Sequence, residues 1–279
     1  MRDGLRIAVL GAGYVGSAFA RAAASVNSRH AVWAVRRTLS PFADGGVTWL
    51  SGDIARGVVA ELPQSLDVVV LTVAPSHGAD TYEQTYLPAA TAAIKLAHGS
   101  GAQKLLYTSS TGVYGGRDGS WVTEQSPRLG AGDSNAALCG AEDVILGAEG
   151  ATATVLRVAG IYGPGRDPRT RMSASEQLPQ RGEYWVNLAH RDDIVAAMLH
   201  VMLLPKAASV LNVSDGAPYT AAHVGRWLAT ARGESAESVV FGNVAQRSRN
   251  DQRVSNAALV ATGWTPQYAT FVDGFTHGM

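Results

Sequence analysis

The sequence is poor in cysteine, balanced in charge and free of long apolar runs. Its one cysteine, Cys139, excludes an intramolecular disulfide and any metal site made of cysteines alone, which is typical of a reducing compartment. Cys139 lies in a helical pattern over residues 135–146, where a small apolar filler is a better interpretation than a catalytic thiol.

The balance of charge and hydropathy excludes further classes of protein. Basic and acidic residues number 23 each, so no overall attraction draws the chain to nucleic acid or to an anionic membrane, and we expect neither partner. No apolar stretch reaches about 18 residues. The first apolar run meets glycines after six residues, so the sequence predicts neither a membrane span nor a signal peptide. We therefore expect a cytoplasmic protein.

Motifs of metal and phosphate chemistry are also missing. The chain has no His-Glu-x-x-His, no paired Cys/His spacing and no Gly-x-x-x-x-Gly-Lys loop. The acidic pair Asp192 and Asp193 stands at a helix start rather than on two converging loops, so a glycosidase is unsupported. The sequence predicts no metal site.

What the chain does have is a glycine-rich turn near its beginning. The apolar run Leu5 to Leu10 predicts a strand, Gly-Ala-Gly-Tyr-Val-Gly predicts a tight turn, and an alanine-rich pattern predicts a helix. This order suits a dinucleotide pyrophosphate: Gly11 permits the turn, Gly13 lets the backbone approach the phosphates, and Gly16 lets the helix pack on the strand. The N–H groups of the first helical turn then face the anion.

The end of the second predicted strand indicates which dinucleotide binds. Residues 31–35 run into Arg36 and Arg37, where an acid would bond a ribose 2′-hydroxyl and an arginine accommodates a 2′-phosphate. We therefore expect NADP(H) in preference to NAD(H), with NAD left open and a solvated basic loop as the alternative. Asp53 either bonds the adenine amine or caps a helix from Ile54. The predicted cofactor contacts are Gly11, Gly13, Tyr14, Val15, Gly16, Arg36, Arg37, Asp53, Ile54, Thr72 and Thr108.

Strands and helices alternate along the chain. Strands are predicted at 5–10, 31–35, 47–50, 66–73, 104–108, 151–158 and 210–213, and helices at 80–98, 134–147, 192–204 and 220–231, with a short helix in the tail 253–275. This alternation predicts an α/β fold with a doubly wound parallel sheet of Rossmann type. The Gly-, Pro- and Arg-rich segment 160–182 interrupts this alternation of strands and helices, and we therefore expect a small C-terminal substrate lobe. The expected division is a dinucleotide-binding core of residues 1–162, to which 186–215 return, and a lobe of residues 163–185 and 216–279.

Three positions have open interpretations. Pro88 predicts a kink or a second start in the helix 80–98. His77, in the loop before that helix, is more typical of a solvated histidine than of a catalytic one. The arginine-rich stretch Arg166 to Arg171 either binds a phosphate or carboxylate or is a solvated loop.

The segment Tyr107 to Gly115, Tyr-Thr-Ser-Ser-Thr-Gly-Val-Tyr-Gly, resembles the extended short-chain dehydrogenase/reductase superfamily in its NAD-dependent epimerase/dehydratase branch. Blocks at 156–165, 187–194, 210–216 and 253–264 resemble the family in the same order. In such enzymes a serine or threonine, a tyrosine and a lysine of Tyr-x-x-x-Lys form the catalytic trio. The resemblance places Ser110 at the serine position, and a strand-end turn residue is its alternative interpretation.

The sequence departs from this family in three places. Aligned on Ala141 and Glu142, the family's tyrosine falls on Ser134 and its lysine on Leu138, and no Tyr-x-x-x-Lys occurs in the chain. A leucine can neither hold a ribose nor lower a phenol's pKa, so the usual proton relay is missing. Leu10 also stands where extended members have their first loop glycine. The resemblance is therefore to the atypical members.

Other groups remain for proton transfer. Tyr114, Tyr162 and Tyr184 are phenols, and His190 is a histidine, the residue type whose ordinary pKa lies nearest to neutral pH. The resemblance implies that Tyr114 and Tyr162 pack beneath the site, whereas Tyr184 faces either a ligand or the core. His190 is either a site residue or part of a helix N-cap. The candidate catalytic residues are Ser110, Tyr184 and His190.

These observations support two functional hypotheses. The first is an NADP(H)-dependent oxidoreductase or epimerase-like enzyme that transfers hydride to or from a small carbonyl, imine or sugar-type substrate. The Asp-Glu pair that resembling sugar dehydratases use for elimination is missing at 110–112, which disfavours dehydration. The second is a non-catalytic NADP(H)-binding sensor or scaffold, favoured by the loss of the tyrosine and lysine. The resemblance also implies a homodimer through the helices 80–98 and 134–147.

Overall fold

The computed structural model describes residues 4–39, 46–57, 61–75, 81–129, 132–167, 178–180, 182–244 and 251–279. The chain divides into two compact units. Unit 1 comprises Met1–Val113, Gly130–Arg157 and Val195–Leu211, and unit 2 comprises Tyr114–Leu129, Val158–Ile194 and Asn212–Met279.

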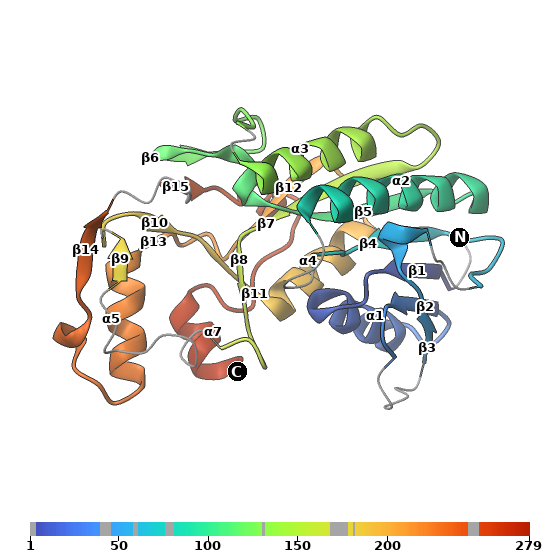
Figure 1. Cartoon of the computed structure of the whole chain (residues 1–279). Coiled ribbons are helices and arrows are strands. Elements are labelled where there is room, and N and C mark those ends of the chain that lie inside the picture. Colours follow the sequence, from blue (N-terminus) through green and yellow to red (C-terminus); the bar gives the residue numbers. More distant parts are fainter. Residues whose placement is uncertain are drawn as a thin grey trace. The chain divides into compact units, whose positions relative to one another are not determined.

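A seven-stranded parallel sheet with the order β12-β7-β5-β4-β1-β2-β3 is the centre of the fold (Figure 1). Its strands are β1 (Arg6–Leu10), β2 (Ala31–Arg36), β3 (Val47–Ser51), β4 (Val68–Leu71), β5 (Lys104–Ser110), β7 (Thr152–Val158) and β12 (Val210–Val213). All four residues of β4 are buried, as expected of a parallel strand covered on both faces. The predicted Rossmann-type sheet is confirmed.

Helices cover both faces of this sheet. Helices α2 (Tyr82–Ser100) and α3 (Asp133–Leu146) pack side by side on one face, and α1 (Tyr14–Val26) and α4 (Arg191–Leu203) lie on the other (Figure 1). Thr81 starts α2 with a capping box, in which its side chain accepts the Gln84 N–H and the Gln84 side chain accepts the Thr81 N–H. Gly101, with φ of +70°, ends the helix in the left-handed conformation.

One local expectation was wrong, and of the two alternatives for Pro88 the second start is excluded whereas the kink stays a prediction. The helix expected from Ile54 is only the short 3₁₀ turn η1 (Ile54–Arg56), because Gly57 with φ of +71° ends it at once. Pro88 does not mark a second start, since α2 continues through it from Tyr82 to Ser100. The predicted start of this helix at Asp80 lies outside the described residues.

Unit 2 contains short strand pairs that the sequence patterns did not predict. These pairs are β6 (Arg117–Val122) with β15 (Asp251–Val254), β8 (Gly160–Tyr162) with β11 (Leu188–His190), β10 (Trp185–Val186) with β13 (Tyr219–Thr220), and β9 (Leu178–Gln180) with β14 (Phe241–Val244). Helices α5 (Ala221–Ala231), α6 (Ala257–Val260) and α7 (Phe271–His277) and the 3₁₀ turn η4 (Ala236–Ser238) follow in the C-terminal part. The core of the unit contains Tyr162, Leu228, Phe271 and Phe275.

The two units do not follow the predicted division at every boundary. Residues 114–129 group with unit 2, because β6 pairs there with β15 from the C-terminal part of the chain. Residues 158–162, 186–194 and 212–215, expected in the core, also group with unit 2. That unit 2 binds the substrate stays a prediction.

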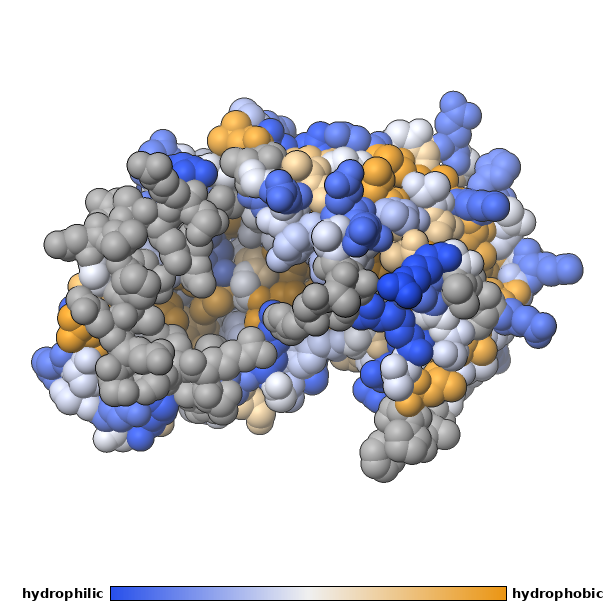
Figure 2. Space-filling model, in the orientation of Figure 1, coloured by the Kyte–Doolittle hydropathy of each residue, from blue (hydrophilic) through white to orange (hydrophobic). Residues whose placement is uncertain are grey.

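On the face drawn in Figure 2, hydrophilic and hydrophobic residues are interspersed. None of the helices in the described part of the chain has the length and hydropathy needed to cross a membrane.

Candidate functional site

The glycine turn after β1 is held by the backbone and by one threonine. Gly11 has φ of +86°, which favours glycine, and its N–H donates to the Val35 carbonyl at 3.0 Å. Thr72, after β4, donates its hydroxyl to the Gly11 carbonyl at 2.8 Å. A Cβ on Gly16 would lie 2.7 Å from the Gly11 carbonyl oxygen and closer still to the Thr72 hydroxyl. Thr72, predicted to contact the cofactor, thus also positions the turn.

Gly13, unlike Gly16, has free space at its Cβ position among the described residues. In this part of the chain, a Cβ at Gly13 would meet a single atom within 4 Å, the Gly11 carbonyl oxygen at 3.9 Å. Gly13 is also the N-cap residue of α1, and no side chain of the described residues caps this helix. Tyr14 and Val15 form the start of α1, where the helix dipole is positive. The open space over Gly13 and the uncapped helix start together form a cradle for an anion such as a pyrophosphate.

The predicted adenosine-binding residues lie at the ends of β2 and β3. Arg36 ends β2 and is half-buried, and Arg37 after it is exposed. The Asp53 side chain accepts the Arg56 N–H at 3.3 Å, so the capping interpretation of Asp53 is confirmed, although it caps only η1. Ile54 is buried. The bond from Asp53 to an adenine stays a prediction.

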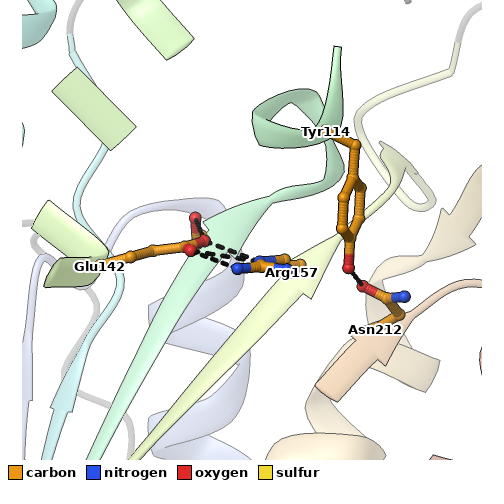
Figure 3. Close-up of polar contacts among 5 residues, drawn as sticks. Tyr114, Glu142, Arg157 and Asn212 are labelled. Carbon is orange, nitrogen blue, oxygen red and sulfur yellow. Dashed lines mark hydrogen bonds and ion pairs between the residues drawn. The ribbon is translucent and has the colours of Figure 1, made fainter. Parts of the chain in front are cut away.

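The polar residues at the end of β5 have different partners. Thr108 donates its hydroxyl to the Leu71 carbonyl at 3.4 Å. Ser109 donates to Glu142 Oε1 at 2.6 Å. Glu142 also accepts from Arg157, with 2.7 Å between Nη2 and Oε2 (Figure 3), and both side chains of this ion pair are buried. The pair ties α3 to β7 within unit 1, and the buried Ser109 hydroxyl bonds the same carboxylate.

Ser110 lies next to a side chain that the sequence did not single out. Its Oγ accepts the Gly112 N–H at 3.1 Å. A Cβ built on Gly112 would lie 3.2 Å from Asn135 Oδ1, and Asn135 belongs to the first turn of α3. Ser134 and Leu138, at the positions aligned with the family's tyrosine and lysine, lie on the same helix. Asn135 was missed because only the fold brings α3 beside the residues after β5.

Tyr114, in unit 2, is fully engaged in packing. Its hydroxyl donates to Asn212 Oδ1 at 2.5 Å (Figure 3). Asn212 in turn donates from Nδ2 to the Ser255 carbonyl at 3.0 Å, and both Tyr114 and Asn212 are buried. This contact agrees with the packing role that the resemblance implied for Tyr114.

The other two candidate acids, Tyr184 and His190, lie in unit 2. Tyr184 is half-buried, and its carbonyl accepts the Ala221 N–H at 2.9 Å. His190 is 1% exposed. Its Nε2 lies 2.8 Å from the Gly278 carbonyl oxygen, and its Nδ1 accepts the Asp192 N–H at 3.2 Å. Since both ring nitrogens bond the backbone, the geometry favours the helix N-cap interpretation of His190.

Two buried polar groups of unit 2 have raised pKa values: Asp215, which the sequence did not single out, and Tyr162, which the resemblance implied to be packed beneath the site. Burial, with a smaller contribution from Asp193, raises the pKa of the Asp215 carboxyl to about 8. Asp215 Oδ1 accepts the Ala217 N–H at 3.1 Å, whereas Oδ2 has no hydrogen-bond partner among the described residues. Burial and then Asp215 raise the pKa of the Tyr162 phenol far above its usual range. Tyr162 therefore keeps its proton near neutral pH.

Some predicted positions cannot be placed. His77 and residues 168–171 lie outside the described residues. Arg166 is described, and its N–H donates to the Gly163 carbonyl at 2.8 Å. Within the described ranges, no three His, Cys, Asp or Glu side chains are grouped so as to hold a metal ion.

Comparisons with known proteins give a family and a fold. The family model described as "NAD dependent epimerase/dehydratase family" matches residues 7–214. A solved structure from Methylobacillus flagellatus, described as an NAD-dependent epimerase/dehydratase, has a TM-score of 0.79 and 28% identity, covering 98% of this chain and 96% of that one. DesIV, a dTDP-glucose 4,6-dehydratase from Streptomyces venezuelae solved with NAD and TYD bound, has a TM-score of 0.81 and 22% identity, covering 98% and 95%.

A curated relative matches over a shorter range. Protein YeeZ of Escherichia coli (strain K12) is 33% identical over 147 residues, which are 53% of this chain and 52% of that protein. The matched region thus spans about half the length of the curated relatives.

Proposed function

Because the chain belongs to the NAD-dependent epimerase/dehydratase family, we propose that it is an NADP(H)-dependent oxidoreductase or epimerase-like enzyme. It transfers hydride to or from a small carbonyl, imine or sugar-type substrate. The observation that carries this proposal is the cradle at the start of α1, where Gly13 is open and no described side chain caps the helix.

The cradle fits the pyrophosphate of a dinucleotide. Gly11 and Gly16 lack room for a Cβ and hold the turn, whereas a Cβ on Gly13 would be the one to point at a ligand. Backbone N–H groups at the helix start and the dipole both favour an anion there. Tyr14, Val15, Thr72 and Thr108 border the same carboxyl edge of the sheet, where open α/β sheets bind ligands.

The preference for NADP(H) rests on Arg36 and Arg37. Arg36 ends β2 and Arg37 follows it, beside the end of β3, after which Asp53 follows. A guanidinium donates charge-assisted hydrogen bonds to a phosphate, and such bonds are about twice as strong as neutral ones. A 2′-phosphate would therefore gain more from these two arginines than a 2′-hydroxyl.

The chemistry needs a hydride carrier and a group that holds the substrate oxygen. When bound, the nicotinamide ring supplies or accepts the hydride. Ser110 is the chain's own hydroxyl at the end of β5, and it orients the reacting oxygen or nitrogen. An imine needs less help from an acid than a ketone does, which suits a chain without Tyr-x-x-x-Lys. Tyr184 and His190 remain candidates only through their sequence positions, and the buried, backbone-bonded His190 is the weaker of the two.

Nucleotide sugars are one substrate class to test. MoeE5, solved with UDP-glucose and NAD, has a TM-score of 0.75 and 20% identity, covering 94% of this chain and 93% of that one, a likeness of fold alone. The family to which this chain belongs supports the choice of sugar-type carbonyls for the first assays.

A sensor or scaffold that binds NADP(H) without turnover is the second candidate. It is favoured by Ser134 and Leu138, because these side chains cannot replace the proton transfer of the aligned tyrosine or the ribose contact of the aligned lysine. Ser110, which stands at the family's catalytic serine position, favours the enzyme over the sensor.

One experiment separates these two functions. The purified protein is titrated with NADPH, and the nicotinamide absorbance is then followed with a panel of ketones, imines and nucleotide sugars. An enzyme consumes NADPH with at least one class of compound. Tight binding of NADPH without oxidation by any of them would favour the sensor.

We also propose a homodimer through α2 and α3. Tyr82 and Leu87 of α2 are 46% and 39% exposed, and such apolar groups gain from burial against a second copy. Light scattering tests this: the expected mass is twice that of one chain, and a Leu87→Glu variant should be a monomer. A wild-type monomer at assay concentration would contradict the proposal.

A further inference from the structure

The proposed hydride transfer lacks a donor for the substrate oxygen at the usual place. Ser134 and Leu138 stand in α3 at the positions aligned with the family's tyrosine and lysine. Leu138 is buried and apolar, so it offers no hydrogen bond. A chain that reduces a carbonyl needs another group to bind the oxygen.

One hydroxyl at the end of β5 is suited to this task. Successive side chains of a strand point to opposite faces, and Ser109 points to the buried Glu142. Ser110 is half-buried, and its Oγ accepts the Gly112 N–H at 3.1 Å. Because that bond uses a lone pair, the Ser110 hydrogen stays available for donation.

The Asn135 side chain, from α3, also lies close to Gly112. An ideal Cβ on Gly112 would lie 3.2 Å from Asn135 Oδ1 and 3.3 Å from Ser110 Oγ. The φ of Gly112 is not among the positive values of the described residues, so lack of space rather than backbone conformation explains the glycine. Two uncharged polar side chains, 25 positions apart in the chain, thus both lie close to Gly112.

We propose that Asn135 is a catalytic residue that binds the substrate's carbonyl oxygen together with Ser110. This inference rests on the proposed oxidoreductase function. A half-turn of the Asn135 amide exchanges its nitrogen and oxygen, so that the NH₂ group lies toward Gly112. Both side chains then donate to one oxygen, as the donors of an oxyanion hole do.

The pair binds and polarises the carbonyl but transfers no proton. Neither an amide nor an aliphatic hydroxyl titrates near neutral pH. A bound reduced nicotinamide dinucleotide would supply the two electrons as hydride for the new C–H bond. Water then protonates the oxygen, which forms the O–H bond of the alcohol and leaves hydroxide. Turnover should therefore show no ionisation of a catalytic phenol between about pH 6 and 9.

The test compares variants with a carbonyl compound that the wild type reduces. Asn135→Ala and Ser110→Ala should each lower kcat by about 100-fold, with the Kd for NADPH within about twofold of the wild type. Asn135→Asp should be as slow as Asn135→Ala, because a carboxylate repels a developing oxyanion.

Two glycine-to-alanine variants form a matched pair. Gly112→Ala places a methyl group between Ser110 and Asn135 and should lower kcat like Asn135→Ala. Gly140→Ala, on α3 with nothing within 4 Å of its Cβ position, should leave kcat unchanged. Circular dichroism melts of all variants show whether each one is folded.

A readout without turnover completes the test. The ¹⁵N side-chain amide resonance of Asn135 is assigned by its loss in Asn135→Ala. It should shift when the carbonyl compound is added to protein saturated with NADP⁺. An unchanged resonance, or kcat within about threefold of wild type in folded Asn135→Ala, would overturn the role of Asn135. Failure to bind NADPH, or binding of NADPH without reduction of any carbonyl, would instead overturn the proposed function on which this inference rests.

Discussion

Two glycines of the same turn have different roles, one in the packing of the fold and the other in the binding of a ligand. A Cβ on Gly16 would lie 2.7 Å from the Gly11 carbonyl oxygen, whereas a Cβ on Gly13 would meet, within the part of the chain that the structure describes, only that oxygen at 3.9 Å. Gly16 therefore allows α1 to pack closely on the turn. Gly13 leaves room for a ligand at the start of α1.

We expect Gly16→Ala and Gly13→Ala to fail in different ways. Gly16→Ala should lower the free energy of unfolding by about 2 kcal/mol, because the overpacked turn must shift. Gly13→Ala should keep the wild-type stability but weaken NADPH binding at least about tenfold, since its methyl group would occupy the ligand's place. Urea unfolding and fluorescence titration measure the two quantities. Equal NADPH affinity in Gly13→Ala would contradict the cradle.

The buried carboxyl of Asp215 should make stability depend on pH. Its pKa in the folded chain, about 8, lies above that of an unfolded aspartate. The contribution of the protonated group is full below about pH 4 and is lost as the pH rises to about 8. Asp215→Asn mimics the protonated acid, so the variant should be more stable than wild type at pH 8, by at most about 5 kcal/mol.

Unfolding in urea at several pH values checks this expectation. The stability gain of Asp215→Asn should shrink as the pH falls toward 4. Asp118→Asn, at an exposed carboxyl, is the matched control and should show no such gain. A gain for Asp215→Asn that does not change with pH would contradict a raised pKa.

At the scale of elements, a buried ion pair joins α3 to β7. Glu142 is 0% exposed and bonds Arg157 and Ser109. Glu142→Gln should lower the free energy of unfolding by about 3 to 5 kcal/mol, because Arg157 would keep a buried charge without a counter-charge.

The double variant Glu142→Leu/Arg157→Leu is the control for the ion pair. It removes both charges and should cost less than Glu142→Gln, since no unpaired charge remains. Chemical denaturation of the single and double variants measures the difference. A double variant less stable than Glu142→Gln would contradict the account.

The elements of unit 1 were predictable because their signals are local. The continuous apolar run around β4 and the glycine turn before α1 are each visible within a few residues. Short strands such as β6 were not, because β6 pairs with β15 at the far end of the chain. Asn135 was missed for the same reason, since its nearness to Gly112 depends on how α3 packs after β5.

The site was likewise predictable only in part. The Gly11 to Gly16 motif indicated a cradle for a pyrophosphate from local sequence alone. His190 had two interpretations in the sequence, and only its bonds to the Gly278 carbonyl and the Asp192 N–H favour one of them. The raised pKa of Asp215 arises from burial that no local pattern reports.

For the whole molecule, the family and the cradle support a dinucleotide-binding protein, and the central claim is that this dinucleotide is NADP(H). Charge-assisted bonds contribute about 1.5 to 3 kcal/mol each, equivalent to roughly 10- to 100-fold in affinity. Arg36 and Arg37 together should therefore distinguish a 2′-phosphate from a 2′-hydroxyl. Arg117→Ala, at an exposed arginine of unit 2, provides a control for the loss of one positive charge.

The most direct measurement is the pair of dissociation constants for NADPH and NADH, obtained by nicotinamide fluorescence for wild type, Arg36→Ala, Arg37→Ala and Arg117→Ala. The account predicts that wild type and Arg117→Ala bind NADPH at least about tenfold more tightly than NADH, and that this ratio falls in the Arg36 and Arg37 variants. Wild-type protein that binds NADH as tightly as NADPH, or more tightly, would contradict it.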